Sequence, residues 1–155
     1  MRWARLLTAS MLLLPTLVVN TGAKEWRGIV PLHSTRSDVI RLLGSPNLDY
    51  DRYELDDGTV SILYSDGPCK TGWDVPKDTV IDIMFQPDDD LTLSDLRLDL
   101  SKYKKKQDYE VLDAYHYRNG PEGHEIVVID NIVSSIFYGP TTKDSHLECS
   151  RKWNK

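Results

Sequence analysis

Hydrophobic residues between positions 29 and 46 recur at helical spacing, and this is the clearest pattern in the chain. The residues that form its apolar stripe are Val39, Leu42 and Leu43. Thr35 and Asp38 have the spacing in which two side chains reciprocally bond backbone N–H groups at a helix start. Gly44 and Pro46 then end the helix. The pattern predicts a short helix that needs tertiary packing, because an isolated helix of this length is unstable in water.

Apolar and polar side chains alternate after this helix, as is typical of β-strands. Three strands are predicted on this basis: residues 49–55, 59–64 and 79–85. Asp56-Asp57-Gly58 separates the first two strands, and Asp-Gly between apolar runs is typical of a hairpin turn. Residues 65–77 contain two glycines and two prolines, which favours a loop before the third strand.

The second half of the chain repeats this order. Thr92 and Asp95 have the same spacing as Thr35 and Asp38, and the apolar residues that follow favour a helix over residues 91–106. Alternating leucines in this stretch also fit a strand: Leu96, Leu98 and Leu100. Three strands are predicted to follow: residues 109–117, 124–129 and 132–138.

The two similar halves predict the fold class and the domain organisation. We expect an α+β protein built as a tandem repeat, each unit being a helix followed by a three-stranded antiparallel sheet, with the helices packed on one sheet face. The units cover about residues 29–87 and 91–140 of a single domain, residues 24–145. Residues 146–155 form a polar C-terminal tail. Chance similarity between the halves is the alternative interpretation.

The first 23 residues have the pattern of a secretory signal. Arg2 and Arg5 precede an apolar run over residues 6–19, and small residues follow at 21–23. The run is short for a membrane span, which needs ~20 residues. We therefore expect a cleaved signal peptide over residues 1–23, a secreted or periplasmic protein, and no stable membrane span after cleavage. The alternative is an uncleaved anchor.

Cys69 and Cys149 are the two cysteines of the chain. We expect an exported protein to join them in a disulfide bond, which would tie the loop after the second strand to the tail. No histidine stands at ligand spacing beside either cysteine, which disfavours a metal site. The aspartates 88–90 also lack the alternating spacing and central glycine of a calcium loop. We expect neither a metal nor a cofactor.

The charge balance bears on the class of partner. The chain has 24 acidic and 19 basic residues, a formal net charge of −5. This balance disfavours nucleic acid and anionic membranes as partners and mildly favours a basic one. Ordinary solubility is the simpler explanation of the charge.

Residues 32–46 combine a hydroxyl residue at the helix start, Asp38-Val39, and the ending Leu43-Gly44-Ser45-Pro46, followed by a hairpin. In this the chain resembles the small envelope proteins of the outer-membrane barrel-assembly machinery. It is also similar to the repeat of the secreted β-lactamase inhibitor proteins, in which two such units stand in tandem. The resemblance implies helices on one side of an antiparallel sheet, and protein binding rather than catalysis. The chain departs from the pattern at Leu32-His33, where a glycine is usual, and it lacks a lipid-anchoring cysteine.

Catalytic motifs are missing from the sequence: it has no Gly-x-Ser-x-Gly elbow, no glycine-rich phosphate loop and no His-Glu-x-x-His helix. We therefore expect an exported protein-binding module of the cell envelope or extracellular space and not an enzyme. Two alternatives stay open. One is a small secreted hydrolase that uses His33 and Asp38; the other is a small-ligand carrier with an apolar pocket between helices and sheet.

Three aromatic residues are candidates for the binding surface. Trp73 lies in the loop beside Cys69, and Tyr115 and Tyr117 are two residues apart on one face of a predicted strand. Aromatic side chains supply a large contact area at low entropic cost. Burial under the helices is the alternative for the tyrosines. His116 alternates with them, and we interpret it as a half-buried histidine whose ring is hydrogen-bonded.

Overall fold

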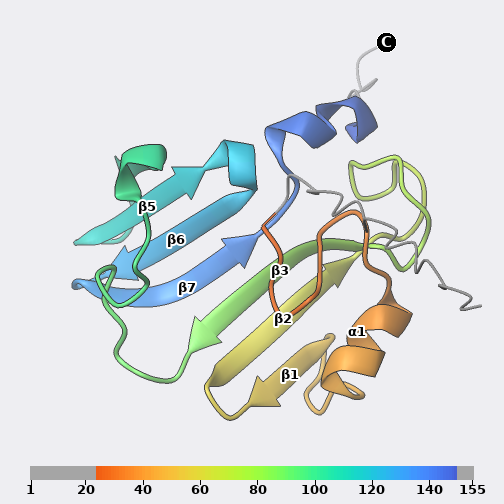
Figure 1. Cartoon of the computed structure of the whole chain (residues 1–155), viewed down its shortest axis with the longest axis horizontal. Coiled ribbons are helices and arrows are strands. Elements are labelled where there is room, and N and C mark those ends of the chain that lie inside the picture. Colours follow the sequence, from red (N-terminus) through yellow and green to blue (C-terminus); the bar gives the residue numbers. More distant parts are fainter. Residues whose placement is uncertain (1–23, 150–155) are drawn as a thin grey trace, which may run out of the picture.

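A seven-stranded antiparallel sheet forms the centre of the protein (Figure 1), which a computed structural model describes over residues 24–149. The strands are β1 (Arg52–Leu55), β2 (Gly58–Tyr64), β3 (Val80–Pro87), β4 (Lys104–Gln107), β5 (Ala114–Asn119), β6 (His124–Ile129) and β7 (Ile132–Tyr138). Their order is β1-β2-β3-β7-β6-β5-β4, so two meanders meet where β3 pairs with β7. The predicted signal peptide, residues 1–23, lies outside the described residues.

The predicted first helix is α1 (Arg36–Leu43), and its ends are those that the sequence indicates. The Thr35 side chain accepts a hydrogen bond from the Asp38 N–H, and the Asp38 carboxylate accepts one of 2.9 Å from the Thr35 N–H. At the other end, Gly44 has a φ of 85° and donates its N–H to the Ile40 carbonyl. Of the three residues in the predicted stripe, Val39 is buried, Leu43 is partly buried and Leu42 stays 47 % exposed.

One face of the sheet, the covered face, carries the hydrophobic core. Residues that pair across the strands form one row on this face: Tyr53, Val60, Phe85, Ile136, Ile126, Tyr117 and Lys105. The first five are at most 8 % exposed. The N-terminal arm crosses β2 and β3 on this side (Figure 1), and Trp26 lies 5.6 Å from Phe85, measured between ring centroids. The arm and α1 therefore cover the half of the sheet formed by β1, β2 and β3.

The opposite face, the open face, has a row of a different kind. Its cross-strand neighbours are Arg52, Ser61, Met84, Phe137, Glu125, Arg118 and Lys104. None of these seven residues is buried. Period-two alternation thus places the apolar core on one side of the sheet and a mixed polar surface on the other.

The predicted tandem repeat is wrong. The described residues contain a single α-helix, and the second half has four strands, β4 to β7, all in the same continuous sheet as the first three. The helix predicted over residues 91–106 does not form. The chain makes turns there, then the short 3-10 helix η1 (Leu100–Lys102), and then the edge strand β4.

Local and tertiary contacts explain why this helix is missing. Thr92 and Asp95 do form the predicted cap, in which the Asp95 carboxylate accepts a 2.8 Å hydrogen bond from the Thr92 N–H. Arg97, however, has a φ of 49°, a left-handed conformation that interrupts a right-handed helix. The partly buried residues that pack against the core from this stretch are Leu91, Leu93, Leu96, Leu98 and Tyr103. Five apolar residues at these positions do not share one helical stripe, so an irregular segment buries them better.

Cys69 and Cys149 form a disulfide bond, as predicted, across a separation of 80 residues. Backbone contacts reinforce this link: the Asp74 N–H donates to the Leu147 carbonyl at 2.8 Å, and Trp73 forms a β-bridge with Glu148. The tail is therefore held by more than its cysteine. No helix among residues 24–149 is both long enough and apolar enough to cross a membrane.

Candidate functional site

The hairpin of β4 and β5 brings basic side chains together on the open face. Lys104 pairs with Arg118 and Lys106 pairs with His116, so these four residues share one side of the sheet. β4 is the last strand of the sheet, and all four of its residues are exposed. Lysines are common on edge strands because their charge opposes pairing with another edge.

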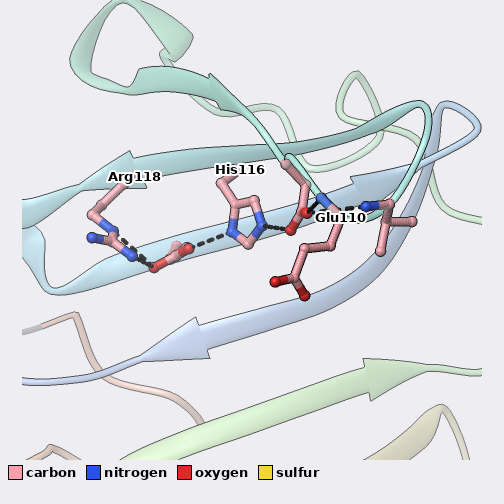
Figure 2. A network of polar contacts seen from close by, with 6 residues as sticks. Glu110, His116 and Arg118 are labelled. Carbon is pink, nitrogen blue, oxygen red and sulfur yellow. Dashed lines mark hydrogen bonds and ion pairs between the residues drawn. The ribbon is translucent and has the colours of Figure 1, made fainter.

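His116 lies at the centre of a polar network that connects strand and loop (Figure 2). One ring nitrogen, Nδ1, lies 2.7 Å from Glu125 Oε1, and the other, Nε2, lies 3.0 Å from Asp108 Oδ2. These hydrogen bonds, first that to Asp108 and then that to Glu125, raise the pKa of His116 above its ordinary value. When the ring is protonated, both nitrogens donate a hydrogen bond and two carboxylates hold the imidazolium.

Asp108 extends the network into the β4–β5 loop, residues 108–113. Its carboxylate accepts hydrogen bonds from the backbone N–H groups of Glu110, at 2.7 Å, and Val111, at 3.1 Å. The Glu110 N–H, followed by the bond to His116, lowers the pKa of Asp108 to about 2. The loop is thereby fixed to the sheet through one charged side chain.

Arg118 completes the row at its other end, as Figure 2 shows. Its Nε and Nη2 lie 2.8 and 2.7 Å from Glu125 Oε2. Glu125 thus bonds Arg118 with one oxygen and His116 with the other. Charge-assisted bonds of this kind hold the side chains in fixed orientations.

A cavity of about 500 Å³ lies beside this network. The residues that line it are Lys104, Lys106, Gln107, Asp108, Tyr109, Glu110, His116 and Arg118. Its volume lies in the range of ligand pockets. Arg118 also lines a second cavity on the open face, of about 190 Å³, together with Asp82 and Phe137. Asp82 lines a third, of about 240 Å³, with Leu63 and Tyr50. The hollowed surface therefore continues from the β4–β5 hairpin toward β2.

The tip of the β4–β5 loop exposes apolar side chains, of which Tyr109 also lines the first cavity. Tyr109 is 88 % exposed, Leu112 82 % and Val111 45 %. Large apolar groups in water that lie close together mark interaction sites more often than single exposed residues do. We call this loop tip together with the first cavity the β4–β5 corner.

The aromatic residues chosen from the sequence do not lie at this corner. Tyr115 and Tyr117 share one side of β5, as predicted, but this is the covered face, and Tyr117 packs against the core. Lys105 lies over both rings, with its Nζ 3.9 Å from the Tyr115 centroid and 5.5 Å from that of Tyr117. Trp73 is in the β2–β3 connection, so β7 and β6 separate it from β5 in the sheet.

Trp73 is partly buried, and it packs on a small apolar cluster of Leu32, Val75 and Ile81. Together with its bridge to Glu148, this contact gives Trp73 a structural role in fixing the disulfide loop. The structure thus places the three proposed binding residues in two separate regions.

The residues of the hydrolase alternative do not form a catalytic pair in the structure. The Asp38 carboxylate bonds Thr35 and, at 2.7 Å, Arg41, while His33 is exposed. No hydrogen bond or ion pair joins His33 to Asp38 among the described residues, and neither lines any of the three cavities. These cavities also lie away from the space between α1 and the sheet, where a small-ligand carrier needs its pocket.

His124 is the other histidine with a distinctive environment. It is 3 % exposed, and its Nδ1 lies 2.6 Å from the hydroxyl of Tyr103. Burial, followed by the charge of Lys24, lowers the pKa of His124 to about 4, so the ring is neutral at pH 7. This pair contributes to packing under the η1 segment. Residues 24–149 contain no group of three His, Cys, Asp or Glu side chains arranged to hold a metal ion.

Sequence reasoning missed the β4–β5 corner. The interpretation of His116 as a hydrogen-bonded histidine agrees with the structure, but its partners were not identified. The sequence does contain a signal for this polar network. His116 and Arg118 are two residues apart on one predicted strand, and Glu125 lies on the next predicted strand, where a hairpin brings it opposite them. Comparisons with protein families, with curated proteins and with solved structures found no match to this chain.

Proposed function

We propose that this chain is an exported protein-binding module and that the β4–β5 corner is its contact surface. The observation that carries the proposal is the exposed apolar tip, Tyr109 and Leu112, on a loop that Asp108 fixes to the sheet. A fixed apolar surface binds with a smaller loss of conformational entropy than a flexible one. Tyrosine is also among the residue types that most often carry the binding energy of an interface.

Export rests on two independent features. The pattern of residues 1–23 is that of a secretory signal. The Cys69–Cys149 disulfide bond is compatible with an oxidising compartment, outside the cytoplasm.

The chemistry of the corner favours binding over catalysis. A general base needs a free lone pair, but both nitrogens of His116 are engaged by carboxylates. Asp108 and Glu125 are occupied in the same network. The side chains that remain available at the corner offer charge and apolar area, which are the means of recognition.

The test is a comparison of matched surface variants. Full-length wild type and Tyr109→Ala/Leu112→Ala, purified and immobilised, are crosslinked in cell-envelope extract, and the partner is identified by mass spectrometry and purified for affinity measurements. Removal of two exposed anchors is expected to weaken binding at least about tenfold, which corresponds to ~1.4 kcal/mol.

Tyr50→Ala is the matched control, because Tyr50 is 92 % exposed and precedes β1 at the other end of the sheet. It is expected to bind like wild type. Trp73→Ala and Tyr115→Ala test the two regions chosen from the sequence in the same assay. Loss of binding in either of these variants, with full binding by Tyr109→Ala/Leu112→Ala, would move the contact surface away from the corner.

A further inference from the structure

We infer that the β4–β5 corner binds an extended acidic segment of the partner, which lies along the free edge of β4 and places alternate carboxylates on Lys104 and Lys106. This inference rests on the proposed function and names the chemistry of the partner. Three observations support it: the charge of the cavity, the spacing of the lysines and the unpaired edge of β4.

The first observation is a local excess of positive charge on an acidic protein. The whole chain has a net charge of −5, yet the cavity is lined by Lys104, Lys106, Arg118 and His116 against Asp108 and Glu110, with Glu125 beside it bonding Arg118 and His116. Asp108 already bonds His116 and two backbone N–H groups.

The two lysines are the uncompensated part of this charge. Lys104 and Lys106 form no ion pair with any of the described residues, while the Arg118 charge is paired with Glu125. Two ammonium groups beside a cavity attract a carboxylate by charge complementarity, and the attraction acts on the association rate as well as on affinity.

The second observation is the spacing of the two lysines. Lys104 and Lys106 are two residues apart on one strand, which puts their Cα atoms ~7 Å apart and their side chains on the same face. Alternate residues of a second extended chain have the same spacing. A segment with the pattern acidic-x-acidic therefore matches the pair when it runs beside β4.

The third observation is the position of β4 at the end of the sheet order, where it pairs with β5 alone. The backbone groups on its other side are unpaired within the sheet and can bond an added strand. Lysines at such an edge repel a second copy of the same edge. The same charges thus disfavour self-association through β4 and select an acidic strand, whose apolar residues can then contact Tyr109 and Leu112.

The experiment is a titration of the ¹⁵N-labelled protein, followed by NMR, with the capped hexapeptide acetyl-Glu-Val-Glu-Val-Glu-Val-amide. Saturable shifts are expected at the amides of residues 104–107 and 109. The Gln-Val version of the peptide is expected to bind at least tenfold more weakly.

Three variants of the protein test the role of the two lysines. Lys104→Glu/Lys106→Glu is expected to lose the shifts, and Lys104→Arg/Lys106→Arg is expected to keep them. Lys70→Glu/Lys77→Glu, which changes two exposed lysines of the disulfide loop, is expected to match wild type. The amide spectrum of each variant also reports whether it is folded.

Several outcomes would overturn the inference. They are equal binding of the Gln-Val peptide, shifts confined to other strands, and the same saturable shifts with inorganic phosphate alone or with an oligothymidylate. The proposed function fails separately. If Tyr109→Ala/Leu112→Ala keeps partner binding while the acidic peptide still binds at Lys104 and Lys106, the apolar tip is not a contact surface. If Tyr109→Ala/Leu112→Ala loses partner binding but Lys104→Glu/Lys106→Glu keeps it, the proposed function is supported and the inference of an acidic segment is wrong.

Discussion

Asp108 and His116 are eight residues apart in the sequence, and a hydrogen bond of 3.0 Å between their side chains closes the β4–β5 loop onto the sheet. The same ring bonds Glu125 on the neighbouring strand, so one imidazolium links the loop, β5 and β6. This arrangement makes the position of the loop dependent on the charge of His116.

The Asp108→Asn variant is expected to lower the pKa of His116 toward its ordinary value of 6.5, because the first and largest cause of the raised pKa is lost. The stabilisation that protonated His116 contributes is complete below pH 6.5, the pKa of the unfolded state. It is lost as the pH rises through the raised pKa of the folded state. Asp108 acts in the other direction: its contribution is present above pH 3.8 and is lost as the pH falls through about 2.

The network is therefore most stabilising between about pH 4 and 6.5. Titration of the His116 ring protons by NMR measures the shift in pKa, and hydrogen exchange of the loop amides should be several-fold faster in Asp108→Asn. Asp113→Asn is the control, since Asp113 is exposed in the same loop. An unchanged pKa of His116 in Asp108→Asn would show that the bond does not hold in solution.

Asp82→Asn is expected to stabilise the protein at neutral pH. Burial on the open face, with Leu63 as cross-strand neighbour, raises the pKa of Asp82 to about 6. The folded state therefore binds a proton more tightly than the unfolded chain, and stability falls as the pH rises from 3.8 to about 6. Asparagine keeps an acceptor for the 2.9 Å bond from the Ile83 N–H and removes the buried charge. The gain should be roughly 2 kcal/mol at pH 7 and close to zero at pH 4.

Urea denaturation at the two pH values measures this gain. Asp66→Asn, at an exposed position in the β2–β3 connection, should change stability by less than about 0.5 kcal/mol. An equal effect of Asp82→Asn at both pH values would mean that the carboxylate is not protonated preferentially in the folded protein.

Gly123→Ala is expected to destabilise the fold by about 3 kcal/mol. Gly123 has a φ of 62°, and a Cβ atom there would lie 2.1 Å from the Gly139 carbonyl oxygen, which no side-chain rearrangement can relieve. Gly72→Ala is the matched control: its φ of 90° is also unfavourable for alanine, but nothing lies within 4 Å of its Cβ position. Its cost should stay near 1 kcal/mol, so the difference in urea midpoint between the two variants measures the backbone clash alone.

Reduction of the Cys69–Cys149 bond should lower the free energy of unfolding by about 4 kcal/mol, because the bond closes a loop of 80 residues. Urea curves with and without reductant measure the difference. Cys69→Ser/Cys149→Ser is expected to match the reduced wild type and to be insensitive to reductant. A wild type whose stability does not respond to reductant would show that the backbone contacts of Trp73, Asp74 and Cys149 hold the tail unaided.

Local sequence rules predicted the elements that local interactions determine. The cap of Thr35 and Asp38 and the glycine at residue 44 set the ends of α1 as expected, and alternation located β2, β3, β6 and β7. These signals work because a capping bond or a period of two does not depend on distant residues.

The prediction for the second half of the chain was wrong where tertiary packing determines the local structure. Thr92 and Asp95 make the same cap as their first-half equivalents, but the leucines after them reach more of the core from an irregular path than from a helix. The predicted strand 109–117 also began too early, because Asp108 bonds the backbone N–H groups of residues 110 and 111 and bends the chain into a loop. A side chain that bonds nearby backbone N–H groups favours a turn over a strand. The alternation of apolar and polar residues does not reveal such a bond.

The candidate site was not predictable for a related reason. Its residues come from β4, the 108–113 loop, β5 and β6, and they meet only through strand register. Edge-strand lysines and an exposed loop leave no hydrophobic periodicity, and the aromatic residues that the sequence favours as binding residues are Trp73, Tyr115 and Tyr117 instead. Those residues support the structure from the covered face and from the disulfide loop.

The place of β7 between β3 and β6 has a consequence for the order of folding. β7 is the last strand of the sheet in chain order, yet it joins the two meanders at their centre. Until β7 pairs, the backbone N–H and C=O groups on one side of β3 are unpaired. This edge carries the apolar residues Ile83 and Phe85, so it can pair with another extended chain. Folding intermediates in which residues 132–138 are not yet paired therefore expose these edges, and docking of β7 should remove their tendency to aggregate.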